Sequence, residues 1–153
     1  MTAELRDEPA DGPAAQALWA EYMALISARL EVQVGDREDI FATPDAFSGP
    51  GSAWLVAYEG DRAVGCGGLR QLAPEVGEIK RMFVTASARG QGLGRRLLTT
   101  LEARSAAAGH HRIRLITTDV LREARALYED AGYRIIETPR EGDRQDYVLE
   151  KEL

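Results

Sequence analysis

Cysteine and histidine are scarce in this sequence of 153 residues. The single cysteine, Cys66, excludes an internal disulfide and a metal site built from several cysteines. The two histidines, His110 and His111, are adjacent, so their side chains point in different directions and make a poor metal pair. We therefore expect no metal. A lone cysteine also agrees with a reducing compartment, and we expect the protein to be cytoplasmic.

Long apolar runs and an excess of positive charge are also absent. No run approaches the ~20 apolar residues that span a bilayer, so we expect no membrane partner. The first 11 residues hold four acidic side chains and no apolar core, unlike a signal peptide. The net charge of −6 argues against a general affinity for nucleic acid. The length fits one domain, residues 1–153, that is large enough for a core.

Apolar periodicity and turn residues predict alternating strands and helices. Helical spacing runs from Pro13 to Leu30, and Gly109 and Gly132 mark the ends of two further helices. The predicted helices are residues 13–30, 93–108 and 124–131. The predicted strands are residues 54–58, 63–72, 77–84, 113–117, 133–137 and 147–151. A polar stretch over 35–51 fits another short helix with a loop.

The order of these elements predicts the topology. The first two strands are joined by a tight turn at Glu59–Arg62 and must be antiparallel. The strand–helix–strand unit from residue 77 to 118 requires a parallel pair with a right-handed crossover. We therefore predict an α/β fold with a mixed, mostly antiparallel sheet of six to seven strands and helices on both faces.

The run Arg89-Gly90-Gln91-Gly92-Leu93-Gly94 lies between a predicted strand and a predicted helix. Glycines at alternate positions let a backbone approach a ligand closely, and the first amides of a helix attract anions. From Ile79 to Leu101 there is no acidic residue, and the segment holds the basic residues Lys80, Arg81, Arg89, Arg95 and Arg96. The run therefore predicts a pyrophosphate site. A glycine-rich turn flanked by solvated arginines is the alternative.

Two other phosphate-binding motifs do not fit this run. A Walker A loop ends in Gly-Lys-Ser/Thr, whereas this run continues Gly94-Arg95-Arg96. The dinucleotide fingerprint needs its last two glycines three residues apart, and Gly92 and Gly94 are two apart.

These features resemble the GCN5-related N-acetyltransferase (GNAT) superfamily. Its pyrophosphate motif, Gln/Arg-x-x-Gly-x-Gly/Ala, is matched by Arg89, Gly92 and Gly94. The segment Glu78–Val84 is similar to the family's central strand, and Ala124–Tyr133 is similar to its last helix and the aromatic residue after it. The resemblance covers residues 53–137 well, with the motifs in the family's order and spacing.

The resemblance implies an acyltransferase that moves acetyl from acetyl-CoA to a primary amine by direct attack in a ternary complex. It implies a central parallel pair that splays, at about residues 78–84 and 112–118, with the cofactor arm between the two strands. Backbone groups on the first strand would pair with the pantetheine and stabilise the oxyanion, and the glycine run would hold the pyrophosphate. The implied cofactor-binding residues are Met82, Phe83, Val84, Arg89, Gly90, Gln91, Gly92, Leu93, Gly94 and Arg95.

Tyr128 is the candidate general acid. A phenol with an ordinary pKa of ~10 can give a proton to a departing thiolate, and the family often places a tyrosine at this point of the helix. The alternative is a core aromatic residue beside Leu127 and Ala131.

Glu78 is the candidate general base. It lies 11 residues before Arg89, the spacing of the glutamate base in the family's histone-modifying members. Strand alternation puts Glu78 on one face with Lys80 and Met82, so an ion pair is the alternative.

Several matters stay open. Leu121 stands where the family often has an asparagine, so Asp119 or a water is a candidate replacement for that polar contact. The acceptor is a small molecule or a peptide, and the acidic chain weakly favours cationic amines. The alternatives to an enzyme are a non-catalytic acyl-CoA sensor and a protein-interaction module, and the family allows a homodimer. Candidate residues for an acceptor pocket, or for the core, are Trp19, Tyr22, Phe41 and Phe47.

Overall fold

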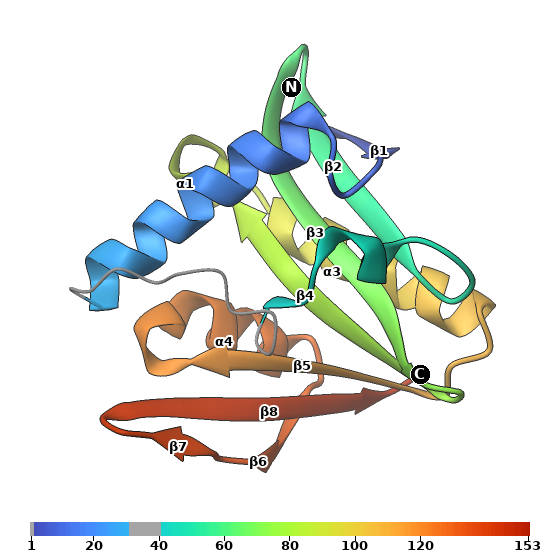
Figure 1. The fold of residues 1–153 in the computed structure, drawn as a ribbon, viewed down its shortest axis with the longest axis vertical. Coiled ribbons are helices and arrows are strands. Elements are labelled where there is room, and N and C mark those ends of the chain that lie inside the picture. The colour runs from blue at the N-terminus through green and yellow to red at the C-terminus, as the bar shows by residue number, and fades with distance from the viewer. Residues whose placement is uncertain (1, 31–40) are drawn as a thin grey trace.

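The computed structural model describes residues 2–30 and 41–153. A mixed sheet forms the centre, with α1 in front of it and α3 behind it in Figure 1, and its strand order is β1-β2-β3-β4-β5-β8-β6, with β7 paired to β8. The strands are β1 (Glu4–Asp7), β2 (Ala53–Glu59), β3 (Arg62–Ala73), β4 (Val76–Val84), β5 (Arg112–Thr118), β6 (Arg134–Glu137), β7 (Arg140–Glu141) and β8 (Arg144–Glu152). The helices are α1 (Pro13–Leu30), α3 (Leu93–Ala107) and α4 (Arg122–Asp130), with 3₁₀ turns η1 (Pro44–Phe47), η2 (Ala86–Ala88) and η3 (Asp119–Leu121).

The predicted fold class is confirmed. Each predicted helix and strand corresponds to one of the described elements, with small differences at the ends. The sequence pattern does not predict β1 and β7, because β1 is a short, largely exposed strand and β7 has only two residues. Of the short helix considered over 35–51, residues 35–40 lie outside the described residues, and η1 is the 3₁₀ turn found in the remainder.

The central parallel pair diverges toward its carboxyl end. β4 and β5 are in register from Val76 with Arg112 to Ile79 with Leu115. Beyond that point β4 continues to Val84 and β5 to Thr118 without pairing to each other. All the other strand pairings in the described chain are antiparallel. The expected splay is therefore present, and it leaves an opening between these two strands.

A bulge at Arg81 changes which side chains of β4 face which side of the sheet. Arg81 has φ +57°, and the register between β3 and β4 shifts between Cys66 and Gly68. Before the bulge Ile79 packs on the α3 side; after it Met82 packs on that side too. The prediction that Met82 shares one face with Glu78 and Lys80 assumed regular alternation along the strand. It is wrong, because the extra residue at the bulge reverses the pattern.

Contacts from distant segments hold the bulge in place. The Arg81 guanidinium donates from Nε to the carbonyl of Phe41 at 3.1 Å and from Nη2 to the carbonyl of Ala42 at 2.6 Å. It also lies 4.0 Å from the centre of the Trp19 ring. A left-handed conformation costs a non-glycine residue about 1–2 kcal/mol, and these contacts offset that cost.

Two hydrophobic cores lie on the two faces of the sheet. On one face β2–β5 and β8 pack against α3 and α4, with Leu55, Leu69, Leu97, Leu98, Leu101, Ile113, Leu115 and Leu149 almost fully buried. On the other face α1 packs against β3 and β4, with a core that contains Leu18, Phe47, Trp54, Val56, Cys66 and Phe83. Among the described helices, none is long and apolar enough to cross a membrane.

A buried polar chain fixes the carboxyl end of α3. The Oγ of Ser105 lies 2.7 Å from Nδ1 of His110, and Nε2 of His110 lies 3.2 Å from Oε1 of Gln71 on β3. Burial lowers the pKa of His110. A Cβ on Gly77 of β4 would lie 2.3 Å from the Ser105 hydroxyl, so only glycine fits beside this chain.

Candidate active site

The splay between β4 and β5 opens into a cavity of about 290 Å³. The cavity brings together the end of β4, the glycine run, the start of α3, and parts of α1 and α4. It is lined by Tyr22, Leu25, Met82, Phe83, Val84, Ala88, Arg89, Gly90, Gly92, Leu93, Gly94, Arg95, Leu121, Glu123, Ala124, Leu127 and Tyr128. Of the residues singled out for cofactor binding or catalysis, Gln91 and Glu78 are not part of this lining.

The glycine run forms the turn that leads into α3. Gly90 and Gly92 have φ values of +79° and +78°, which glycine adopts without steric cost. Gly92 is the N-cap of α3, and no side chain caps the helix there. The first intrahelical bond runs from the amide of Arg96 to the carbonyl of Gly92. The amides of Leu93, Gly94 and Arg95 therefore have no intrahelical acceptor, and these three residues line the cavity.

Gly94 has a packing role that the motif does not reveal. A Cβ at this position would lie 3.2 Å from Cδ2 of Leu127 on α4. The absence of a side chain therefore lets α4 approach the first turn of α3. Tyr128 follows Leu127 directly, so this close approach also sets the position of Tyr128 beside the glycine-rich turn.

The charge around the glycine run is positive. Arg89 is fixed at the cavity edge, where its Nε donates to the carbonyl of Val84 at 3.0 Å. Arg95 also lines the cavity. The one acidic residue in the lining, Glu123, is paired with Arg29 of α1 at 2.6 Å. This end of the cavity is therefore suited to a pyrophosphate.

Two tyrosines face the same cavity from different helices. Tyr128 of α4 is only 6% exposed, and burial raises the pKa of its hydroxyl to about 12. Its hydroxyl has no hydrogen-bond partner within the described residues, while its ring packs edge-on against Tyr133. Tyr22 of α1 stacks on Phe83 with ring centres 5.3 Å apart. Burial, and to a lesser degree the nearby Tyr128, raises the pKa of Tyr22.

Glu78 lies in an ion-pair cluster outside the cavity lining. Its Oε1 accepts a hydrogen bond from Nε of Arg70 at 2.7 Å and lies 3.7 Å from Nζ of Lys80. The Glu78 side chain is 5% exposed. The carboxylate is thus paired with two cations, and this geometry favours the ion-pair alternative over the role of a base.

The backbone of β4 is available on the side of the splay. β3 pairs with Phe83 and Val84 on one side of the strand. Toward β5, pairing ends at Ile79, so the segment 80–84 has no strand partner on that side in the described chain. An extended ligand arm can add to this edge as a strand does.

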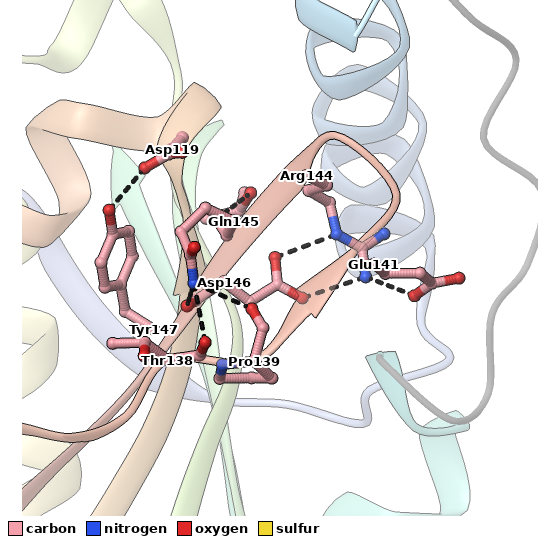
Figure 2. Close-up of polar contacts among 9 residues, drawn as sticks. Asp119, Thr138, Pro139, Glu141, Arg144, Gln145, Asp146 and Tyr147 are labelled. Atoms are coloured by element: carbon pink, nitrogen blue, oxygen red, sulfur yellow. Dashed lines mark hydrogen bonds and ion pairs between the residues drawn. The ribbon is translucent and has the colours of Figure 1, made fainter.

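The hairpin of β7 and β8 lies beside the far end of β5 (Figure 2). There the Tyr147 hydroxyl donates to Asp119 at 2.8 Å, and Arg144 is paired with Glu141 and Asp146. Asp119 is thus already engaged and is not part of the cavity lining. Leu121, at the position where a polar contact is usual in the family, does line the cavity, so that contact is replaced by apolar surface.

A second cavity of about 250 Å³ lies beside α1. Of the four aromatic acceptor candidates, Trp19 and Phe41 line this second cavity and Tyr22 lines the first. Phe47 is instead a buried core residue that packs against Trp54. Contacts among Trp19, Tyr22 and Phe41 separate the two cavities.

The sequence patterns do not predict that Leu25 contributes to the first cavity, and they leave Tyr22 open between an acceptor pocket and the core. These residues belong to α1, far along the chain from the glycine run, and a helical apolar pattern does not distinguish core from cavity lining. The Arg29–Glu123 ion pair links α1 to α4. The sequence does not predict it either, because the two residues are far apart in the chain.

The splayed sheet and the glycine-rich turn before α3 define an acyltransferase type of fold, and comparison with known proteins agrees. Residues 15–133 match the model of the acetyltransferase (GNAT) family, and the chain belongs to this family. The chain is 31% identical over 137 residues to "Uncharacterized N-acetyltransferase YjgM" of Escherichia coli K12, which covers 87% of this chain and 80% of that protein.

Solved structures show the same fold. A GCN5-related N-acetyltransferase from Kribbella flavida superposes with a TM-score of 0.74 and 25% identity, over 99% of this chain and 98% of that one. An aminoglycoside 6'-N-acetyltransferase complexed with coenzyme A superposes with a TM-score of 0.73 at 20% identity, over 97% and 96% of the two chains.

Proposed function

We propose that this protein transfers the acetyl group of acetyl-CoA directly to a primary amine. The observation that carries the proposal is one cavity that is lined both by Leu93, Gly94 and Arg95, at the uncapped start of α3, and by Tyr128. Family membership supports acetyl transfer, and a protein of the same fold is known with coenzyme A bound. The arrangement fits a ligand with an anionic end, a long arm and a reactive group near a proton donor.

The backbone of this chain performs the binding steps. The amides of residues 91–95, with Arg89 and Arg95, hold the pyrophosphate. The edge of Met82–Val84 pairs with the pantetheine arm, and an amide near Met82 or Phe83 stabilises the negative charge that develops on the acetyl oxygen. Apart from Gln91, these residues line one cavity, as the reaction requires.

Tyr128 supplies the proton that the departing thiolate needs. Because burial raises the pKa of the hydroxyl to about 12, it stays protonated at neutral pH and is present as an acid when the thiolate leaves. The ring is fixed by Tyr133 and Leu127, and the hydroxyl is not used elsewhere in the described chain.

Glu78 holds two cations in place in this proposal and does not act as the base. Replacing Glu78 with glutamine removes the charge that pairs with Arg70 and Lys80, and we expect a loss of about 2 kcal/mol in unfolding free energy. Chemical denaturation measures this loss. The acidic limb of the pH profile of kcat/KM is expected to stay unchanged; if that limb disappears in the variant, Glu78 is the base after all.

The proposed function is tested with purified protein, acetyl-CoA and a panel of amines. Acetyl-CoA is expected to raise the melting temperature, and release of free thiol is expected to depend on a primary amine. No thermal shift at millimolar acetyl-CoA contradicts the proposal and supports an interaction module. A clear shift without thiol release from any amine supports a non-catalytic acyl-CoA sensor.

A further inference from the structure

The five tyrosines of the chain fall into two groups according to what their hydroxyls contact. Tyr58, Tyr133 and Tyr147 each donate to a carboxylate elsewhere in the chain, at 2.6, 2.8 and 2.8 Å. The hydroxyls of Tyr22 and Tyr128 have no hydrogen-bond partner within the described residues. These two are also the tyrosines that line the first cavity. Because polar groups inside a protein are nearly always hydrogen-bonded, the two hydroxyls without a partner point to a ligand that completes them.

Both of these hydroxyls are accessible. In the described chain, the fully buried side-chain polar atoms that lack a partner are the indole nitrogen of Trp54 and the hydroxyl of Thr117. The hydroxyls of Tyr22 and Tyr128 also lack a partner but are not among these buried atoms. They therefore lie at accessible surface, which for both residues includes the wall of the cavity. A molecule bound in the cavity can reach each of them.

The two tyrosines approach the splay from different faces of the sheet. Tyr128 belongs to the core on the α3 face, whereas Tyr22 packs against the core on the α1 face. The Tyr22 ring stacks on Phe83, with ring centres 5.3 Å apart, and Phe83 belongs to the part of β4 that does not pair with β5. Tyr22 is therefore next to the strand segment that the acetyl carbonyl meets in the proposed function, on which this inference rests.

Neighbouring residues fix the position of the Tyr22 ring. Besides Phe83, its centre lies 5.5 Å from that of Trp19 and 6.3 Å from that of Phe41. An ion pair of 2.6 Å between Arg29 and Glu123 also connects α1 with α4, the helix of Tyr128. A side chain that is already held in place loses little further freedom when it binds a ligand. The Tyr22 hydroxyl is therefore suited to orient a reactant.

The two faces give the two hydroxyls different tasks. In the proposed function, the cofactor phosphates lie at the start of α3 and Tyr128 serves the departing thiolate. The amine that attacks the acetyl group then has the α1 side of the cavity. On that side Tyr22 supplies a hydroxyl, whereas Leu25 and Phe83 beside it are apolar.

The Tyr22 hydroxyl can bind an amine but cannot serve as a base at neutral pH. Burial raises the pKa of Tyr22, and the nearby Tyr128 adds to the shift. The phenol therefore stays protonated at neutral pH and does not take up a proton. Its oxygen still accepts a hydrogen bond from an N–H group.

We propose that Tyr22 binds the nitrogen of the acceptor amine. Its oxygen accepts a hydrogen bond from one N–H of the neutral primary amine, and this contact directs the lone pair of the nitrogen at the acetyl carbon. The amine and the thiolate are thus each served by a phenol of their own, one from α1 and one from α4. Tyr22 orients the amine and transfers no proton.

Replacing Tyr22 with phenylalanine tests this role, because it removes the hydroxyl and keeps the stacked ring. Thiol release is measured with phenethylamine and cadaverine, two primary amines with different tails, and with every other amine of the panel that is acetylated. We expect kcat/KM for each amine to fall about three- to tenfold, as the loss of one hydrogen bond provides. The change is expected mainly in the KM of the amine, and the Kd of acetyl-CoA, measured by titration calorimetry, is expected to stay the same.

Tyr58→Phe is the matched control. Tyr58 packs against the same core as Tyr22, but it is not part of the lining of either cavity described above, and its hydroxyl donates to Glu8. This variant is expected to have a lower melting temperature and unchanged kinetics. Tyr22→Phe is expected to melt no lower than the wild type, because a hydroxyl without a partner does not stabilise the fold. If it fails to fold, Tyr22→Met replaces it, since the flexible methionine side chain fills irregular space.

The outcomes separate this inference from the proposed function. Unchanged kinetics in Tyr22→Phe contradict the inference alone and make Tyr22 a core residue. A lower kcat with an unchanged KM of the amine also overturns it, because Tyr22 then acts on the departing thiolate. A weaker Kd of acetyl-CoA shows a disturbed cavity and counts against a specific contact with the amine. If no amine of the panel is acetylated, the proposed function is contradicted and the inference falls with it.

Discussion

Replacing Gly92 with glutamate is expected to abolish binding of acetyl-CoA while leaving the fold largely intact. Gly92 is the N-cap of α3 with φ +78°, and a Cβ there meets no other atom within 4 Å. The new carboxylate would lie beside the amides to which the proposed function assigns the pyrophosphate. Repulsion between unit charges at contact distance is worth about 1–4 kcal/mol near a protein surface, so we expect affinity to fall about a hundredfold or more.

Gly60→Glu is the control for the backbone strain of this change. Gly60 has φ +62° in the turn between β2 and β3, and a Cβ there also meets nothing within 4 Å. Both variants add one negative charge and force a left-handed residue, but only Gly92 lies at the cavity. Titration calorimetry with acetyl-CoA measures the difference. Equal affinities of the two variants for acetyl-CoA would contradict the proposed anion-binding role of the turn before α3.

Replacing Tyr128 with phenylalanine is expected to lower kcat about a hundredfold or more while leaving the Kd of acetyl-CoA nearly unchanged. General acid catalysis typically contributes a factor of about 10²–10⁴. The ring contacts with Tyr133 and the surrounding core do not need the hydroxyl, so the fold and the cofactor site are retained. Steady-state thiol release gives kcat, and calorimetry gives the Kd.

Tyr133→Phe provides the matched control for Tyr128. Tyr133 is also buried, but its hydroxyl donates to Glu102 of α3 at 2.8 Å and does not line the cavity. This variant is expected to have a lower melting temperature and an unchanged kcat. If Tyr128→Phe behaves in the same way, with normal turnover, Tyr128 is a core residue and the proton comes from elsewhere.

Local signals in the sequence predict most of the fold. Glycines with positive φ, such as Gly60, Gly109 and Gly132, end the elements where the pattern places them, because no other residue adopts that conformation easily. The crossover between β4 and β5 follows from chain length and handedness. β1 is missed because pairing with β2, and not its own composition, makes it a strand.

The sequence predicts only those parts of the candidate site that a single segment of the chain forms. The glycine run of 89–94 is local, and its conformation follows from the motif. The bulge at Arg81 depends on carbonyl groups of Phe41 and Ala42 and on the Trp19 ring, which strand periodicity cannot reveal. The partner of Glu78 at shortest distance, Arg70, comes from the neighbouring strand of a hairpin. Such groups are visible only once the register is known.

The two ends of α3 are secured in different ways. At its carboxyl end Ser105 and His110 form a buried hydrogen-bonded chain to Gln71, whereas at its amino end no side chain caps the helix. We therefore expect amide hydrogen exchange to be slow in the last turn without any ligand, and to become slow in the first turn only when the proposed cofactor binds. Protection of the amides of Leu93, Gly94 and Arg95 would then report whether the cavity is occupied, while exchange at the carboxyl end of α3 would not change.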